Sequence, residues 1–343
     1  MNARALSLIL VCLALPLWAQ GFAGLGQSAK DYALPDPDFR FSFPGDHGSH
    51  PDFRIEWWYV TANLTAADST PYGVQWTLFR NALNPGGAPG DQVWMGHAAV
   101  STPEGHLYSE RLARGGTDQS GVTASPFSAH IDEWMMTGPD LSEIAVTAQG
   151  HEFRYDLQMK ATGPFVPQGK AGYSVKSEAG QASHYYSQPF YEVTGTLELP
   201  SGKVEVTGRA WLDREWSSQP LTDTQTGWDW VSLHFEGGDK LMGYRLRDND
   251  GSAYTVGTWI AADGTPTPLE NGELMMRPVE ETRVAGRDVP TVWDISLPAR
   301  DVSIRVAAVY PESWMGTRIP YWEGPVTVEG SHPGQGYLEM SGY

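Results

Sequence analysis

The chain has 343 residues, with 41 acidic and 23 basic side chains, and its formal net charge is −18. That balance argues against nucleic acid or an anionic membrane surface as a partner. Hydrophobic residues make up 41% of the chain and there are 14 tryptophans, which excludes a disordered protein and leaves room for two ordinary domains. The 38 glycines and 25 prolines interrupt the chain too often for long helices.

The N-terminus has the features of a secretory signal peptide. Arg4 supplies a positive charge, residues 5–18 form an apolar run, and Leu17-Trp18-Ala19 is suited to cleavage. We therefore predict a signal peptide over residues 1–19 and a periplasmic or secreted protein. Cys12, the single cysteine, lies within it, so a mature chain would have no disulfide and no thiolate site. A lipid anchor on Cys12 is the alternative, which the bulky neighbour Val11 disfavours.

Residues 20–50 are rich in Gly, Pro and Asp, which predicts an irregular lead-in. A short stretch at its end offers four side chains that can bind zinc or manganese: Asp46, His47, His50 and Asp52. The stretch is a turn-rich loop, however, and we predict neither a metal nor a cofactor.

From residue 51 onward, apolar and polar residues alternate with a period of two. The alternation is clearest in residues 152–160, 191–199 and 302–310, and it is typical of half-buried antiparallel strands. Similar runs occupy residues 55–64, 72–80, 93–101, 106–112, 144–149, 203–212, 228–236, 241–248, 253–260, 273–279, 292–297, 326–329 and 336–340.

About sixteen short strands and no long helix predict an all-β protein with two closed or nearly closed antiparallel barrels. The turn-rich residues 217–227 predict the division between them. We place one domain at residues 51–219 and the other at residues 220–343. An eight-stranded barrel is about the size that holds one small apolar ligand.

Aromatic side chains repeatedly stand beside a carboxylate. Burying a carboxylate costs several kcal/mol unless it is paired, so such segments predict either a lined cavity or structural ion pairs. The segments are Glu56-Trp57-Trp58-Tyr59, Trp211-Leu212-Asp213-Arg214-Glu215-Trp216, Trp228-Asp229-Trp230 and Tyr321-Trp322-Glu323.

On a strand over residues 209–216, Trp211, Asp213 and Glu215 share one face, and Arg214 and Trp216 share the other. The two carboxylates would lie about 7 Å apart at Cα. In a dry pocket the pKa values of such a pair separate, which produces an acid and a base. The alternative is a structural network in which Arg209 or Arg245 neutralises them.

Residues 228–236 place Trp228, Trp230 and His234 on one face of a strand that is apolar on both sides. His234 could carry a proton beside Asp213 or Glu215, or it could be a hydrogen-bonded core histidine.

The ordered motifs of this chain resemble the AttH-like and carotenoid 1,2-hydratase-like family from about His50 to the C-terminus. The motifs are His50-Pro51, Glu56-Trp57-Trp58-Tyr59, Trp211 to Ser217, Gly227-Trp228-Asp229-Trp230, Leu241 to Arg247, Tyr321-Trp322-Glu323-Gly324 and Gly336-Tyr337-Leu338-Glu339. The resemblance implies two lipocalin-like β-barrels packed side by side. Carotenoid hydratases of this family add water to an isoprenoid double bond without a cofactor.

In the hydratases an Asp-His-Asn-Trp-like segment corresponds to Asp213-Arg214-Glu215-Trp216 here, and a Tyr/Asp pair falls near residues 242–246. Trp216 and Tyr244 match that pattern. Arg214 replaces the histidine, and the nearest aspartate, Asp248, is displaced toward a turn. The exported, lipocalin-like members resemble this chain more closely.

We therefore expect a monomeric exported protein that binds an isoprenoid or lipid-like molecule in an aromatic cavity. The expected catalytic residues are Asp213, Glu215 and Tyr244. The expected ligand-binding residues are Glu56, Trp57, Trp58, Trp211, Arg214, Trp216, Trp228, Trp230, His234, Arg245 and Trp322. Hydration or hydrolysis at this cavity is one hypothesis. A non-enzymatic carrier or chaperone that serves a transporter is the second, and a purely structural aromatic core is the third.

Overall fold

The computed structural model describes residues 31–219 and 221–343, so the predicted signal peptide over residues 1–19 lies outside the described residues. Within the described residues the structure is all-β and has no α-helix. The described part of the chain also has 3-10 turns at Gly45–His47, Pro89–Asp91 and Pro298–Arg300. The described part of the chain contains no helix long and apolar enough to cross a membrane.

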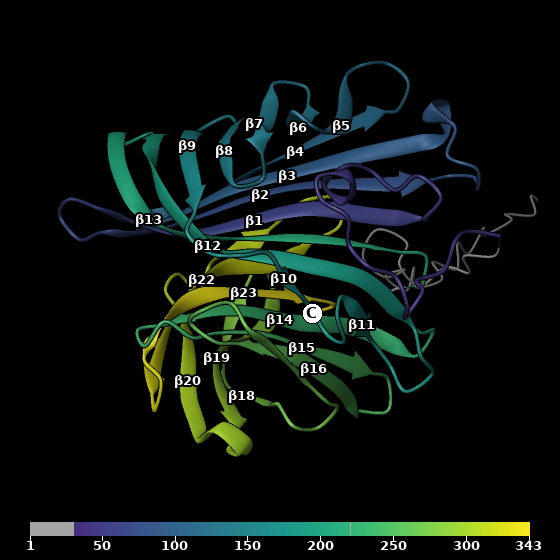
Figure 1. The fold of residues 1–343 in the computed structure, drawn as a ribbon. Helices are drawn as coiled ribbons and strands as arrows, with labels where there is room; N and C mark the ends of the chain where they lie inside the picture. Colours follow the sequence, from purple (N-terminus) through teal and green to yellow (C-terminus); the bar gives the residue numbers. More distant parts are fainter. Residues whose placement is uncertain (1–30, 220) are drawn as a thin grey trace, which may run out of the picture.

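The first sheet contains thirteen strands, and eleven of them follow one antiparallel path in the order β4-β3-β2-β1-β13-β12-β9-β8-β7-β6-β5. This path curls into a nearly closed barrel, drawn from purple to teal (Figure 1). Two short strands, β10 and β11, add to β12 off the path. The bounds are β1 Ile55–Ala66, β2 Pro71–Ala82, β3 Gln92–Thr102, β4 Gly105–Arg114, β5 Ser120–Ala124, β6 Phe127–Ile131, β7 Trp134–Asp140, β8 Glu143–Gln149, β9 Arg154–Ala161, β10 Val166–Pro167, β11 Tyr173–Val175, β12 Ala182–Leu199 and β13 Gly202–Ser217.

The second sheet contains ten strands in the order β17-β16-β15-β14-β23-β22-β20-β19-β18, with β21 paired to β22 off the path. It curls into a half-barrel beside the first sheet (Figure 1). The bounds are β14 Gln225–Phe235, β15 Lys240–Asp248, β16 Ala253–Ile260, β17 Pro266–Leu269, β18 Met275–Val284, β19 Arg287–Leu297, β20 Val302–Ala308, β21 Trp314–Met315, β22 Tyr321–Gly330 and β23 Gly334–Ser341.

The all-β prediction with two antiparallel barrel-like sheets side by side is confirmed, although the second sheet is a half-barrel. The predicted number of strands was too low, because the described residues form twenty-three. The missed strands are short, such as Phe127–Ile131, and the prediction for residues 191–199 left out the first half of its strand. The first half of Ala182–Leu199 is buried on both faces, so its polar and aromatic residues show no period of two.

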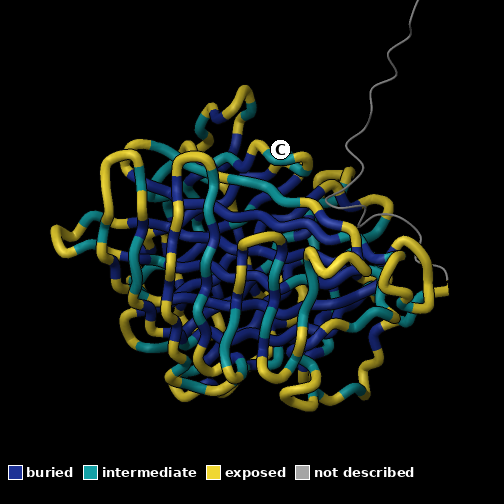
Figure 2. The backbone as a smooth tube through the Cα atoms, turned by 90° about the horizontal axis from the view of Figure 1, so that it is seen from above, coloured by how far each residue is buried: buried dark blue, intermediate teal, exposed yellow. Residues whose placement is uncertain are grey.

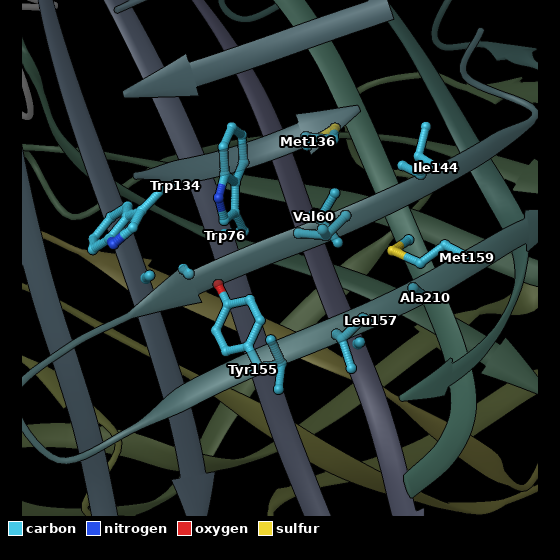
Figure 3. Close-up of a cluster of buried hydrophobic side chains, with 14 of the residues drawn as sticks. Val60, Trp76, Trp134, Met136, Ile144, Tyr155, Leu157, Met159 and Ala210 are labelled. Carbon is cyan, nitrogen blue, oxygen red and sulfur yellow. The ribbon is translucent and has the colours of Figure 1, made fainter. Parts of the chain in front are cut away.

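The protein has three main apolar cores, one inside each sheet and one between the sheets. Tightly packed side chains such as Val60, Trp76, Trp134 and Tyr155 fill the first barrel (Figure 3). Trp293 and Trp322 belong to the core inside the second sheet. Residues from both sheets, including Tyr59, Trp211 and Trp230, form the third core. Accordingly the central strands are almost wholly buried, and exposure concentrates in the loops (Figure 2).

The pairing of β1 with β13 determines which side chains face the second sheet. Tyr59 pairs with Asp213, and Trp57 pairs with Glu215. Because successive side chains on a strand point to opposite faces, these four residues lie on one face of the sheet. Their neighbour Trp58 packs inside the first barrel instead. The middle of this sheet thus presents aromatic and acidic residues to the second sheet.

Candidate functional site

A pocket lies between the two sheets, at the middle of their shared core. Its cavity volume is about 60 Å³, and it opens partly to solvent. Strands β1, β2, β13, β14, β15 and β23 supply most of its walls. The lining residues are Ile55, Trp57, Tyr59, Thr77, Phe79, Lys176, Asp213, Glu215, Leu221, Trp228, Trp230, Tyr244, Leu246 and Glu339. The pocket is therefore aromatic and aliphatic, with a few convergent polar groups, as expected of a small-molecule site.

Asp213 is a buried carboxyl in the wall that the first sheet provides. Its Oδ2 accepts a hydrogen bond from the Tyr185 hydroxyl at 2.6 Å, and its Oδ1 accepts one from Trp211 Nε1 at 2.6 Å. Ser187 donates a third. Burial raises the pKa of Asp213 to about 7, although these three hydrogen bonds act in the opposite direction. Near neutral pH this carboxyl therefore has access to both protonation states.

Glu215, two residues farther along β13, has a different environment. Lys176 Nζ lies 2.9 Å from Glu215 Oε1, and both side chains are almost fully buried. The hydroxyls of Ser183 and Tyr244 also donate to this carboxylate, the latter at 3.2 Å. Burial lowers the pKa of Lys176 while Glu215 raises it, and the ammonium sits 3.9 Å above the Tyr244 ring. Glu215 thus has a dedicated buried counter-charge, whereas Asp213 has neutral donors.

The second sheet contributes Glu339 to the facing wall. Trp228 Nε1 donates to Glu339 Oε1 at 2.6 Å. Burial raises the pKa of Glu339 to about 7, although the hydrogen bond from Trp228 and the nearby Tyr59 hydroxyl act in the opposite direction. Trp230, next to Glu339 across the β14–β23 ladder, completes this wall. Two carboxyls with raised pKa values, one from each sheet, therefore line a single aromatic pocket.

Seven of the predicted site residues line this pocket or stand directly behind its wall. Asp213, Glu215, Tyr244, Trp57, Trp228 and Trp230 line it, and Trp211 donates to Asp213 from the surrounding core. The predicted split of residues 209–216 between two faces is confirmed. The alternative in which Arg209 or Arg245 neutralises the acidic pair does not match the contacts, because Lys176 is the cation at Glu215.

Four predicted residues lie on the opposite face of the first sheet. Glu56 is a buried carboxylate between two guanidiniums, with Arg214 Nη2 2.9 Å from its Oε2 and Arg80 Nε on its Oε1. Arg214 also covers the Trp58 ring at 3.9 Å. Burial raises the pKa of Glu56, but Arg80, His50 and Arg214 together hold it well below its ordinary value. Trp216 packs against the lead-in through Phe39 and Phe41. Because successive side chains on a strand point to opposite faces, these residues point away from the pocket.

Three more predicted residues belong to structural contacts elsewhere. Trp322 is in the core inside the second sheet and donates to the Pro311 carbonyl. Arg245 pairs with buried Asp229 at 2.8 Å on the far face of that sheet. His234 Nε2 bonds the Pro189 carbonyl at 2.9 Å, and burial lowers the pKa of His234 to about 3. His234 thus matches the hypothesis of a hydrogen-bonded core histidine.

Ion pairs and hydrogen bonds hold three of the four candidate metal ligands at the end of the lead-in, Asp46, His47 and His50. His50 contacts Asp46 at 3.2 Å and Glu56 at 3.3 Å, and its ring stacks on Trp216. His47 Nδ1 lies 2.7 Å from the Tyr186 hydroxyl. Within residues 31–219 and 221–343, His, Cys, Asp and Glu side chains do not gather in groups of three or more that could hold a metal. The lead-in is therefore a packed cover over Trp216 and Arg214.

A family model described as AttH-like matches residues 34–343, which is most of the chain. The chain belongs to the AttH-like family. An AttH candidate from Nitrosomonas europaea is similar in structure, with a TM-score of 0.83 and 31% sequence identity, over 91% of this chain and 99% of that one. No protein of curated function matches this AttH-like chain in sequence.

Two solved structures with low sequence identity share the fold of this AttH-like protein. Kievitone hydratase from Nectria haematococca has a TM-score of 0.68 and 16% identity, over 91% of this chain and 98% of that one. CghA, solved with Sch210972, has a TM-score of 0.52 and 14% identity, over 90% of this chain and 97% of that one.

Sequence reasoning missed several groups in the pocket of this AttH-like protein. Glu339 and Tyr59 lie in two of the segments that the sequence analysis singled out, Gly336-Tyr337-Leu338-Glu339 and Glu56-Trp57-Trp58-Tyr59, but neither residue was predicted to belong to the site. Tyr185 lies in the doubly buried half of β12, where alternation is lost. Lys176 lies outside every predicted strand, just beyond β11, so no local pattern pointed to it.

Proposed function

We propose that this AttH-like protein binds an isoprenoid or lipid-like molecule in the inter-sheet pocket and adds water to one of its double bonds without a cofactor. The observation that carries the proposal is the placement of two carboxyls on facing walls of one aromatic pocket, buried Asp213 and half-buried Glu339, whose pKa values are both raised to about 7. A carboxyl that is partly protonated at neutral pH is available as the proton donor that hydration of a double bond needs.

The chemistry assigns one role to each wall. Protonated Asp213 transfers its proton to one carbon of the double bond, which leaves a cation on the other carbon. The faces of Trp57, Trp228 and Trp230 stabilise that cation. Water attacks the cation and loses its extra proton to ionised Glu339. Atoms balance, because one water is added and one proton passes from Asp213 to Glu339. Glu215, held by Lys176, and Tyr244 orient the polar end of the site.

The test is turnover on a panel of isoprenoid alkenes and unsaturated lipids, followed by mass spectrometry for the gain of one water. We expect Asp213→Asn and Glu339→Gln to lower the rate by about 10²–10⁴-fold, the usual contribution of a positioned acid or base. Affinity should change only a few-fold. Asp294→Asn, at a partly exposed ion pair of the second sheet, is the matched control and should keep wild-type activity.

The pH profile follows from the same groups. Asp213 must be protonated to act, so activity should fall as pH rises through about 7. Glu339 must be ionised to accept a proton, so activity should also fall as pH drops below about 7. A bell-shaped profile centred near neutral pH is the expected result. Flat activity through neutral pH, or full activity in Asp213→Asn, would contradict the assignment.

A carrier is the second candidate, and the hydrogen bonding of Asp213 favours it. Both oxygens of Asp213 already have donors without a substrate, as in a rigid binding pocket. A carrier would bind the apolar panel without turnover and would deliver its cargo to a transporter. In that case Asp213→Asn would leave affinity within a few-fold and no activity would be lost.

A further inference from the structure

Glu323 is a second buried carboxyl, one layer behind the pocket. Its side chain is fully buried, and its Cα is paired with that of Glu339 across the β22–β23 ladder. Tyr59, from the first sheet, donates a hydrogen bond to Glu323 Oε1 and also lies within hydrogen-bonding reach of Glu339. Burial and the nearby Glu339 raise the pKa of Glu323 well above its ordinary value, which favours its neutral form.

Hydrogen bonds connect Glu323 to the edge of the molecule. The Tyr321 hydroxyl lies within hydrogen-bonding reach of Glu323 and 3.0 Å from His97 Nδ1. His97 is fully buried, and its Nε2 lies 3.3 Å from Glu110 Oε1. The Glu110 side chain is 18% exposed and contacts Arg318 at 3.2 Å. With Tyr59 and Glu339 included, the series therefore runs from a pocket carboxyl to a solvent-accessible one and crosses between the two sheets three times.

The hydrogen bonds of this series run in one direction, with each donor on the side nearer the pocket. Burial raises the pKa of Glu110, but the bonds from His97 and Arg318 lower it overall, so Glu110 is an ionised acceptor. His97 Nε2 must then carry the hydrogen. Burial also lowers the pKa of His97, so the ring is neutral and Nδ1 accepts from Tyr321. Tyr59 likewise donates outward, toward Glu323. Each donor thus points away from the pocket.

We propose that these side chains form a proton relay between the pocket and solvent, made of Glu339, Tyr59, Glu323, Tyr321, His97 and Glu110. The inference rests on the proposed hydration, in which Glu339 gains a proton from water. Tyr59 passes its own proton to Glu323 and takes the one from Glu339, and Glu323 passes its proton to Tyr321. Tyr321 protonates His97 Nδ1, and Nε2 releases its proton to Glu110 and solvent. One O–H or N–H bond breaks and one forms at every step, and rotation of the groups restores the starting state.

The test needs no substrate. Rapid mixing into D2O, followed by infrared spectroscopy, measures how fast the buried carboxyl protons exchange with solvent. Glu323→Gln and Glu339→Gln assign the carbonyl bands. We expect exchange to slow by about a hundredfold in His97→Gln and in Tyr321→Phe, the lower range of what a positioned proton-transfer group supplies. Both variants keep the bulk of the side chain and remove its ability to pass a proton.

His106→Gln is the matched control. His106 lies on neighbouring strand β4 and contacts Ser101 and Met315 rather than the relay, so its replacement should leave the exchange rate unchanged. Backbone amide exchange of β22 and β23 shows whether a variant loosens the sheet. Unchanged carboxyl exchange in the folded His97 and Tyr321 variants would overturn the relay, as would equal slowing in His106→Gln. Because no turnover is measured, the relay and the proposed hydration fail separately.

Discussion

At the scale of single residues, the account depends on how each buried charge is balanced. Lys176 and Glu215 form an isolated buried ion pair, with side chains only 4% and 1% exposed. Removal of one partner leaves the other charge desolvated and uncompensated, which typically costs 3–5 kcal/mol. Asp213 avoids this cost in another way, since a carboxyl whose pKa is raised to about 7 gives up its charge.

We therefore expect Lys176→Met to lower the free energy of unfolding by about 3–5 kcal/mol, because Glu215 remains buried without its cation. Urea denaturation measures the difference. Lys203→Met is the matched control, since Lys203 pairs with Glu205 on the surface with more than half of each side chain exposed. That exposed pair should contribute about 0–1 kcal/mol. Similar losses for both lysine variants would mean that the Lys176–Glu215 pair is not specially stabilising.

At the scale of strands, the sequence determined more of the fold than of the site. The alternation in residues 152–160 correctly placed Tyr155, Leu157 and Met159 on the buried face of β9. The alternation in residues 209–216 correctly separated Asp213 from Arg214. However, period two assigns faces within a strand and does not say which strands lie opposite one another. Glu56, Trp58 and Trp216 were therefore grouped with the pocket, although they face the lead-in or the first barrel.

The residues that contact the site from distant parts of the chain could not be predicted from local sequence patterns. Lys176 reaches Glu215 across 39 positions of the chain from a stretch with no strand periodicity, and Glu339 meets Asp213 only because two sheets pack together. The aromatic–carboxylate segments indicate that a site exists. They do not identify which distant residues pair with its carboxylates.

Strand β13 tests the packing at this scale. Gly208 lies where β13 passes β1, and a Cβ placed there would stand 2.0 Å from the Asn63 carbonyl oxygen. Because a backbone atom cannot move aside cheaply, we expect Gly208→Ala to destabilise the protein by about 1–3 kcal/mol or more in urea denaturation. Gly121→Ala, whose nearest neighbour would be His130 at 3.5 Å, should be close to neutral. No loss for Gly208→Ala would mean that the β1–β13 pairing adjusts easily.

At the scale of the whole molecule, the pocket exists because two sheets share a core. Trp57, Tyr59 and Asp213 come from the first sheet, and Trp230 and Glu339 come from the second. Neither sheet alone encloses the site. Direct bonds also join the sheets, including Tyr59 to Glu323 and Asn63 to the Gly336 carbonyl. The sheets thus hold acidic groups on two sides of one apolar space, the arrangement on which both the proposed hydration and the carrier alternative depend.

The central claim is that an apolar molecule occupies this inter-sheet pocket, and a titration with cis-parinaric acid, a fluorescent polyene fatty acid, tests it most directly. We predict saturable binding of one molecule per chain. Leu221→Trp, which adds bulk at a partly buried position of the pocket wall, should weaken binding strongly. Leu83→Trp, at a side chain that is 51% exposed, should leave it unchanged. No binding to the wild-type protein, or equal binding to both tryptophan variants, would contradict the claim.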